Sequence, residues 1–134
     1  MSLEIAVREK EGVRILDLKG RLTAGKEVER LREAIHEQLE AGHTKLVLNM
    51  AGVDYIDSTG LGSLVVCFTR VQRAGGALKL LNLNRREIQL LILTKLTTVF
   101  ELFDDEQDAV NSFFPGRKIK RFDILSFVKK HSQE

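Results

Sequence analysis

Apolar residues occupy every second position near the start of the chain. This pattern covers residues 3–10, and a second apolar-rich run covers 13–19. A period of two is typical of strands, and Glu11-Gly12 between the runs can form a turn, so an N-terminal β-hairpin is predicted. Residues 20–25 have a glycine at each end and are predicted to form a loop.

The spacing of apolar residues then changes to three and four positions. Residues 26–41 carry apolar side chains on one side and charged ones on the other, which predicts an amphipathic helix that Gly42 ends. Further helices are predicted over 60–73, from the capping box Asn84-Arg85-Arg86-Glu87, and from Asp104 or Asp105 through Phe113. The strands predicted between these helices are 45–50, 77–83 and 97–102.

Strands and helices therefore alternate after the hairpin. Such alternation predicts an α/β fold with a mostly parallel central sheet and packed helices. The run 45–50 is almost entirely apolar, as expected of a strand that is buried on both faces. With 134 residues, the chain is the right size for a single domain.

Charge divides the chain into two parts. Residues 1–114 carry 15 basic and 17 acidic side chains, whereas 115–134 carry 6 basic and 2 acidic ones. We therefore predict a domain over 1–114 and, beginning at the single proline, a basic C-terminal extension over 115–134. Its apolar residues 122, 125 and 128 have helical spacing, so the extension is expected to hold a short helix.

The role of this extension is open. We expect its helix to dock on the domain with the lysines in water. Contact with an acidic partner, self-association and weak nucleic-acid binding are alternatives. Direct nucleic-acid binding is not expected, because no DNA-reading motif is present. A further hypothesis is that the extension folds back and changes the charge balance near the segment described below.

Composition excludes several other classes of protein. The only cysteine, Cys67, cannot make an internal disulfide or a cysteine-based zinc site, and we expect it to be a core residue rather than a reactive thiol. No apolar run reaches the ~18 residues of a membrane-spanning helix. Residues 1–12 do not resemble a signal peptide. A cytoplasmic location, with no membrane partner and no metal site, is expected.

The clearest candidate for function is Asp57-Ser58-Thr59-Gly60-Leu61-Gly62 (DSTGLG), which leads into a predicted helix. Asp57 and Ser58 are both good N-caps, since their side-chain oxygens accept hydrogen bonds from the free amides of a first helical turn. Gly60 and Gly62 cost helix stability relative to alanine. They supply bare backbone instead, which a partner or an anion could approach closely.

This segment resembles the D-S-[ST]-G-L-G signature of the STAS-domain anti-sigma factor antagonist (anti-anti-sigma factor) family. Val47–Met50 (VLNM), Gly75-Gly76 and Gly20-Arg21-Leu22 also resemble parts of that family, and the resemblance covers roughly 3–113. It implies the STAS fold and a bacterial regulatory protein that binds other proteins and is not an enzyme.

The resemblance also implies a phosphorylation switch at Ser58. The kinase would be an anti-sigma factor with serine kinase activity, which the unphosphorylated protein binds, so that a sigma factor is freed. Phosphorylation would break this complex. The kinase brings the ATP, so the chain needs no cofactor. A phosphatase and a second copy of the chain are left open as further partners. The implied partner surface comprises Gly20, Arg21, Leu22, Thr23, Asp57, Thr59, Gly60, Leu61 and Gly62.

A phosphate at Ser58 is physically reasonable as a switch. It adds about −1.5 to −2 charges, which the free amides and macrodipole of a helix N-terminus can hold without unfolding the domain. Inhibition would then arise at the interface. One position departs from the family, because Thr23 stands where an aspartate is common. A hydroxyl cannot replace a carboxylate in a charged contact, so partner choice or binding strength is open.

Other interpretations compete with this one. Ser58 can be an ordinary N-cap, and the chain can be a STAS subunit of a larger scaffold or transport assembly, or a small-ligand or nucleotide-binding STAS domain. Catalysis is not expected, because the sequence places no histidine as a base for Ser58. Gly60 and Gly62 do not begin a nucleotide-binding fingerprint, since its third glycine would fall at Val65.

Overall fold

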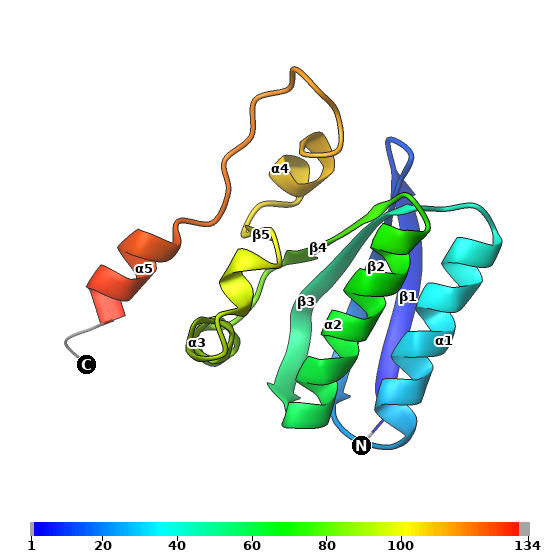
Figure 1. The fold of residues 1–134 in the computed structure, drawn as a ribbon, viewed down its shortest axis with the longest axis horizontal. Coiled ribbons are helices and arrows are strands. Elements are labelled where there is room, and N and C mark those ends of the chain that lie inside the picture. The colour runs from blue at the N-terminus through cyan, green and yellow to red at the C-terminus, as the bar shows by residue number, and fades with distance from the viewer. Residues whose placement is uncertain (1, 132–134) are drawn as a thin grey trace.

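The computed structural model describes residues 2–131 (Figure 1). Its sheet has the strand order β1 (Leu3–Lys10), β2 (Val13–Leu22), β3 (Lys45–Ile56), β4 (Ala77–Leu81) and β5 (Leu102–Phe103). The helices are α1 (Lys26–Glu40), α2 (Ser58–Arg73), α3 (Arg85–Leu93), the 3₁₀ helix η1 (Leu96–Thr98), α4 (Glu106–Asn111) and α5 (Ile124–His131).

The sheet confirms the predicted fold class. Strands β1 and β2 form the antiparallel N-terminal hairpin, and β2, β3, β4 and β5 are parallel neighbours. Parallel neighbours need crossover connections, which α1, α2 and the pair α3 and η1 supply. The carboxyl ends of β2 and β3 therefore lie side by side, with Leu22 paired to Ile56, and the segments that follow both strands meet there.

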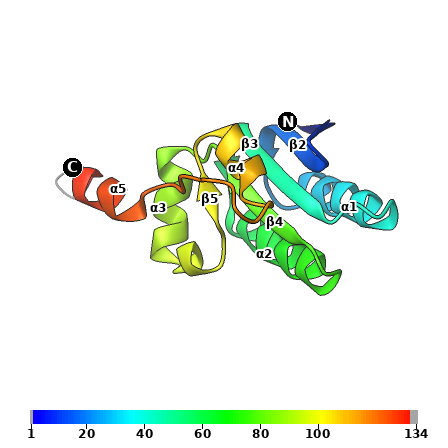
Figure 2. The ribbon, with the colours of Figure 1, turned by 90° about the horizontal axis from the view of Figure 1, so that it is seen from above.

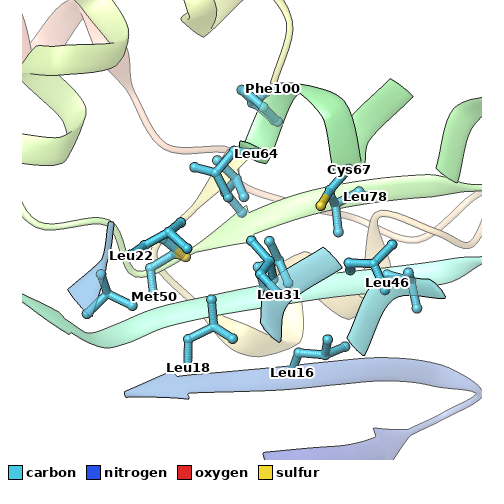
Figure 3. Packing of buried hydrophobic residues seen from close by; sticks show 14 of the residues in the cluster. Leu16, Leu18, Leu22, Leu31, Leu46, Met50, Leu64, Cys67, Leu78 and Phe100 are labelled. Carbon is cyan, nitrogen blue, oxygen red and sulfur yellow. The ribbon is translucent and has the colours of Figure 1, made fainter. Parts of the chain in front are cut away.

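The helices cover the two faces of the sheet unequally. Helices α1, α2 and α3 pack on one face, and the short α4 packs on part of the other (Figures 1 and 2). In the larger core, Leu31 of α1 and Leu64 of α2 lie over the strand residues Leu16, Leu18 and Leu46 (Figure 3). The strand β3 is buried on both faces near its start, as predicted.

Cys67 belongs to this larger core, where its side chain is fully buried (Figure 3). Burial raises the pKa of the thiol to about 11. Since the thiolate is the reactive form of cysteine, this environment keeps the side chain unreactive. The prediction of a core residue is confirmed.

Signals for helix starts are confirmed at two places. Asn84 and Glu87 form the predicted capping box, in which each side chain accepts a hydrogen bond from the other residue's backbone amide. Asp105, one of the two predicted caps, accepts from the backbone amide of Asp108 and starts α4. Helix α4 ends at Asn111, slightly earlier than predicted.

The predicted loop over 20–25 is wrong in its first half. Strand β2 continues to Leu22 and pairs with β3, which itself continues to Ile56. Gly20 sits where the pairing register shifts, with φ of 120°, and a Cβ there would lie 2.3 Å from the carbonyl oxygen of Ser2. Glycine is therefore required by a bulged strand, although glycine in a sequence more often signals a loop.

The predicted strand over 97–102 is also wrong. The chain turns through η1 after Lys95 in the left-handed conformation, and only Leu102–Phe103 pair with β4. Residues 97–99 are β-branched and favour a strand locally. The tight turn instead lets Phe100 enter the core, and this packing outweighs the local preference. Strand β4 likewise ends at Leu81, before the predicted boundary.

The C-terminal extension contains the predicted helix, α5. Phe122 and Ile124 pack against the larger core, whereas Leu125 and Val128 are exposed. The chain therefore contacts the domain just before the helix and at its first residue, Ile124. There the backbone amide of Phe122 donates to the carbonyl oxygen of Leu102.

Candidate functional site

The segment DSTGLG lies where β3 passes into α2. Residues 54–56 belong to β3, Asp57 is the N-cap, and Ser58 is the first residue of α2. The neighbouring strand β2 ends at Leu22, so the short loop 23–25 lies beside the start of α2. The two segments that the sequence assigned to one partner surface are thus brought together.

Asp57 joins these two segments. One carboxylate oxygen accepts a hydrogen bond from the backbone amide of Ala24 at 3.0 Å, and the other accepts from that of Gly60 at 2.7 Å. The Asp57 amide in turn donates to the Leu22 carbonyl oxygen at 3.3 Å. The bonds from Ala24 and Gly60 are the main reasons why the pKa of Asp57 is lowered, since both favour the charged carboxylate.

These contacts give Asp57 and Ser58 different roles. Both were predicted as possible N-caps, and the structure assigns the cap to Asp57. Ser58 is exposed at the first helical position. Asp57 already occupies the amide of Gly60, so the first turn is not the open phosphate cradle that the sequence suggested. A phosphate on Ser58 would lie beside an existing negative charge.

The two glycines of the segment have different surroundings. Gly60 is buried, and a Cβ built on it would lie 2.0 Å from the carbonyl oxygen of Leu22. Gly62 is exposed, and a Cβ there would meet nothing within 4 Å. The expectation of accessible backbone is therefore wrong for Gly60, whose lack of a side chain lets α2 approach β2. The same expectation of accessible backbone agrees with the open surroundings of Gly62.

The other residues of the expected partner surface are likewise partly buried and partly exposed. Leu22 and Leu61 are buried in the core, so their side chains hold the site in place rather than face a partner. Gly20 is constrained by the bulge in β2. The side chains that reach the surface are those of Arg21 and Thr59, with Thr23 half-buried.

Two neighbouring residues, Tyr55 and Glu27, extend this surface, and the sequence analysis assigned neither of them to it. Tyr55 is exposed beside Arg21, whose guanidinium carbon lies 4.9 Å from the centre of the Tyr55 ring. This cation–π contact follows from the pairing of β2 with β3, which sets the two residues opposite each other. Thr23 donates a hydrogen bond to Glu27 at 3.4 Å, so its hydroxyl already faces a carboxylate.

Glu87, predicted only as part of a capping box, has a buried carboxyl group close to this region. Its side chain is 4% exposed, and one carboxyl oxygen accepts from the Asn84 amide while the other, Oε2, has no partner in the described residues. Burial raises its pKa to about 7, with a further contribution from Asp54 on β3. The capping-box signal located Glu87 correctly but could not show that its carboxyl group is buried.

Within residues 2–131, no hydrogen bond links the Ser58 hydroxyl to a histidine. His36 lies far along α1, with Nδ1 3.2 Å from a guanidinium nitrogen of Arg70, near the opposite end of α2. Near Ser58, the Asp57 carboxylate binds backbone amides and the Thr23 hydroxyl donates to Glu27. Such a site can present a hydroxyl to another protein.

The STAS domain model matches residues 4–109 of the chain. The chain belongs to the STAS domain family. Within the described part of this STAS chain, no helix combines the length and apolar character needed to cross a bilayer.

One curated protein and two solved structures show what this chain is similar to. The anti-sigma-B factor antagonist of Bacillus subtilis is 40% identical over 72 residues, which cover 54% of this chain and 65%, just under two thirds, of that protein. A crystal structure of a candidate anti-sigma factor antagonist from Thermotoga maritima matches with a TM-score of 0.75 and 23% identity, over 81% of this chain and 92% of that one. The Bacillus cell fate determinant SpoIIAA, in its phosphorylated form, matches with a TM-score of 0.64 and 19% identity, over 82% and 99%.

Substitutions of Asp57 should separate its two backbone contacts. Asp57→Ala is expected to remove amide-exchange protection at both Ala24 and Gly60 and to lower Tm by a few degrees, because the cap and the link between segments are lost. Asp57→Asn keeps one acceptor oxygen and is expected to keep protection at Gly60 only. NMR amide hydrogen exchange measures both sites. Unchanged protection of Ala24 in Asp57→Ala would contradict the assigned contact.

Proposed function

We propose that this STAS domain is a phosphorylation-controlled protein-binding switch that acts as an anti-sigma factor antagonist. In its unphosphorylated form it binds an anti-sigma factor with serine kinase activity, and phosphorylation of Ser58 releases that partner. The name of the Bacillus subtilis relative supports the antagonist role, and the resemblance of DSTGLG to the family signature supports the position of the switch.

The observation that carries the proposal is the exposed position of Ser58 at the start of α2. The hydroxyl projects from the first helical residue, while the backbone on both sides is held through Asp57 and Gly60. A kinase can therefore reach the hydroxyl without opening the fold. SpoIIAA, which shares this fold, has been solved in a phosphorylated form, so the fold is compatible with this modification.

The inhibitory effect of the phosphate follows from its surroundings. Phosphorylation adds about −1.5 to −2 charges next to the Asp57 carboxylate. Because Asp57 already binds the amides of Ala24 and Gly60, the phosphate stays on the surface with its charge facing a docking partner. A partner that fits the neutral serine then meets a bulky dianion. The domain keeps its fold while it loses its interface.

The surface available to the partner is small and mixed in character. It consists of Ser58, Thr59 and the open backbone of Gly62 on α2, together with the stacked Arg21 and Tyr55 at the ends of β2 and β3. Aromatic and arginine side chains of this kind often dominate the affinity of an interface. Thr23 faces Glu27 and offers a hydroxyl in place of the charge common in the family.

The proposal is tested by incubating the chain with candidate anti-sigma kinases and ATP, then measuring intact mass. We expect a gain of one phosphate that Ser58→Ala abolishes. Thr59→Ala is the matched control, because Thr59 is also exposed and adjacent, and it should still be phosphorylated. Full phosphorylation of Ser58→Ala would exclude Ser58 as the acceptor.

Binding of the partner provides a second measurement. The phosphorylated chain is expected to bind the anti-sigma factor at least ~10-fold more weakly than the unphosphorylated chain, equivalent to about 1.4 kcal/mol. Calorimetry with both forms measures this difference. Equal affinities would refute the switch, and recovery of a stable multi-subunit particle in place of a kinase would favour the scaffold alternative.

A further inference from the structure

A groove of about 740 Å³ lies between the beginning of β1 and helix α1. Its lining residues are Ser2, Leu3, Glu4, Lys26, Glu27, Glu29, Arg30 and Glu33. A smaller hollow of about 110 Å³ continues along the same side of α1, lined by Ile5, Val7, Arg30, Glu33, Ala34 and Glu37. Carboxylates predominate over cations along this groove, so it attracts positive charge.

The groove also has an apolar wall. Val7 is 42% exposed and Ile5 is half-buried, and both lie on β1, the edge strand of the sheet. Ala34 faces them from α1. Apolar side chains framed by charges are suited to an amphipathic segment that carries the opposite charge.

Helix α5 has the complementary character. Its exposed side includes Leu125 and Val128, which are 65% and 40% exposed and three residues apart. The helix contains Lys129 and Lys130 and no acidic residue. An apolar pair next to basic side chains is what an acidic groove with an apolar wall would accept.

The helix cannot reach the groove of its own chain as the molecule is folded. Helix α5 lies beyond α3, whereas α1 and β1 lie at the other end of the molecule in both views (Figures 1 and 2). The segment before α5 is held by Arg117 paired with Glu11 and by Arg121 paired with Glu101. An occupant from outside the molecule is therefore required.

We propose that the β1–α1 groove of one copy binds helix α5 of a second copy. The groove is long enough for the helix, since the eight residues of α5 span about 12 Å and the stretch of α1 from Lys26 to Glu37 spans about 18 Å. Helix and groove are different surfaces, so the contact is heterologous and runs from the tail of one copy to the first helix of the next.

A contact of this size is weak and depends on salt. One short helix buries less area than a standard stable interface, so self-association is expected only well above micromolar concentrations. The exposed charges on both sides are screened within about 10 Å at 0.1 M salt. Raising the salt concentration should therefore separate the copies.

Charge reversal provides a test with the full chain. Sedimentation velocity of the wild type is expected to show a mass that rises with concentration and falls with added salt. Glu29→Lys with Glu33→Lys makes the groove basic, and Lys129→Glu with Lys130→Glu makes the tail acidic. Each double variant alone should remain monomeric, because its groove and tail then carry like charges. An equal mixture of the two should associate, because each tail again meets a groove of opposite charge.

Each result decides the proposal. Recovery in the mixture supports it, and circular dichroism of each variant shows that loss of association is not loss of fold. A wild type that stays monomeric at all concentrations overturns it, as does association that survives reversal of the groove. Monomeric wild type that binds anionic vesicles through its Lys129 and Lys130 side chains also overturns it, since α5 would then serve a membrane surface.

Discussion

An alanine at position 60 is expected to lower the free energy of unfolding by about 3 kcal/mol or more. The added methyl group would lie 2.0 Å from the carbonyl oxygen of Leu22 and 2.9 Å from its carbonyl carbon. Both atoms belong to backbone that is paired with β3, so no flexible side chain can move aside. The substitution must push α2 away from β2 or distort the end of the sheet.

Displacement of α2 would also break the contacts that Asp57 makes. The Gly60 amide donates to the Asp57 carboxylate, and the Asp57 amide donates to Leu22, so all three residues share one small network. Residues in one network lose stability together. We therefore expect Gly60→Ala to disturb the position of Ser58 as well as the stability of the fold.

Gly62→Ala is the matched control for this effect. Gly62 lies in the same helix, and a Cβ there meets nothing within 4 Å. Alanine is favoured over glycine inside a helix, so this variant is expected to gain up to about 1 kcal/mol. Urea denaturation of both variants measures the difference. Equal effects of the two substitutions would show that helix propensity, rather than the contact with Leu22, controls this segment.

The different surroundings of Gly60 and Gly62 could not be predicted from the sequence. A glycine in a helix start is visible in the sequence, and its cost in helix stability is known. Whether such a glycine packs closely on Leu22 or faces open space depends on strand β2, which lies more than thirty residues earlier in the sequence. The sequence therefore located the site but treated Gly60 and Gly62 as equivalent.

Local signals were otherwise sufficient for most of the fold. The alternation of strands and helices, the Asn84 capping box and the Asp105 cap each depend on residues within a few positions, and each is confirmed. The wrong predictions arose where distant contacts decide. Gly20 lies in a bulged strand opposite Leu3, and Phe100 draws the end of η1 into the core.

At the candidate site too, predictions were correct where local residues decide and incomplete where distant contacts decide. Asp57 and Ser58 were recognised from the local motif, and the structure separates the cap from the exposed hydroxyl. Tyr55 was missed because its partner Arg21 is brought to it only by the pairing of β2 with β3. Glu87 was recognised as a cap partner. Its burial depends on the packing of α3 against the sheet, which no local pattern reports.

Glu87→Gln is expected to make the domain more stable at pH 8 and to have little effect near pH 4.5. Burial raises the pKa of Glu87 to about 7, above its ordinary value of 4.5, so the folded protein takes up a proton that the unfolded chain does not hold between these pH values. The stability that protonation contributes is therefore complete below about pH 4.5. It is lost progressively as the pH rises to about 7.

The size of this difference in stability follows from the raised pKa of Glu87. A carboxylate whose Oε2 is buried without a partner costs on the order of 3 kcal/mol at pH 8 relative to the neutral form, at about 1.36 kcal/mol per unit of pKa. Glutamine is neutral at every pH and keeps an oxygen to accept from the Asn84 amide, as the capping box requires. The variant removes the charge while it preserves the local structure.

Glu106→Gln is the control for the pH dependence. Hydrogen bonds from Arg8 are the main reason that the pKa of Glu106 is lowered, so its contribution is lost only as the pH falls below the ordinary range of a carboxyl group. Between about pH 5.5 and 8 the difference between Glu106→Gln and the wild type should stay constant. Urea denaturation should show the advantage of Glu87→Gln growing between about pH 5.5 and 7 and levelling off above about pH 7. Parallel curves for the wild type and Glu87→Gln would mean that the Glu87 carboxyl group titrates near its ordinary pKa, so that it must reach water or a donor in solution.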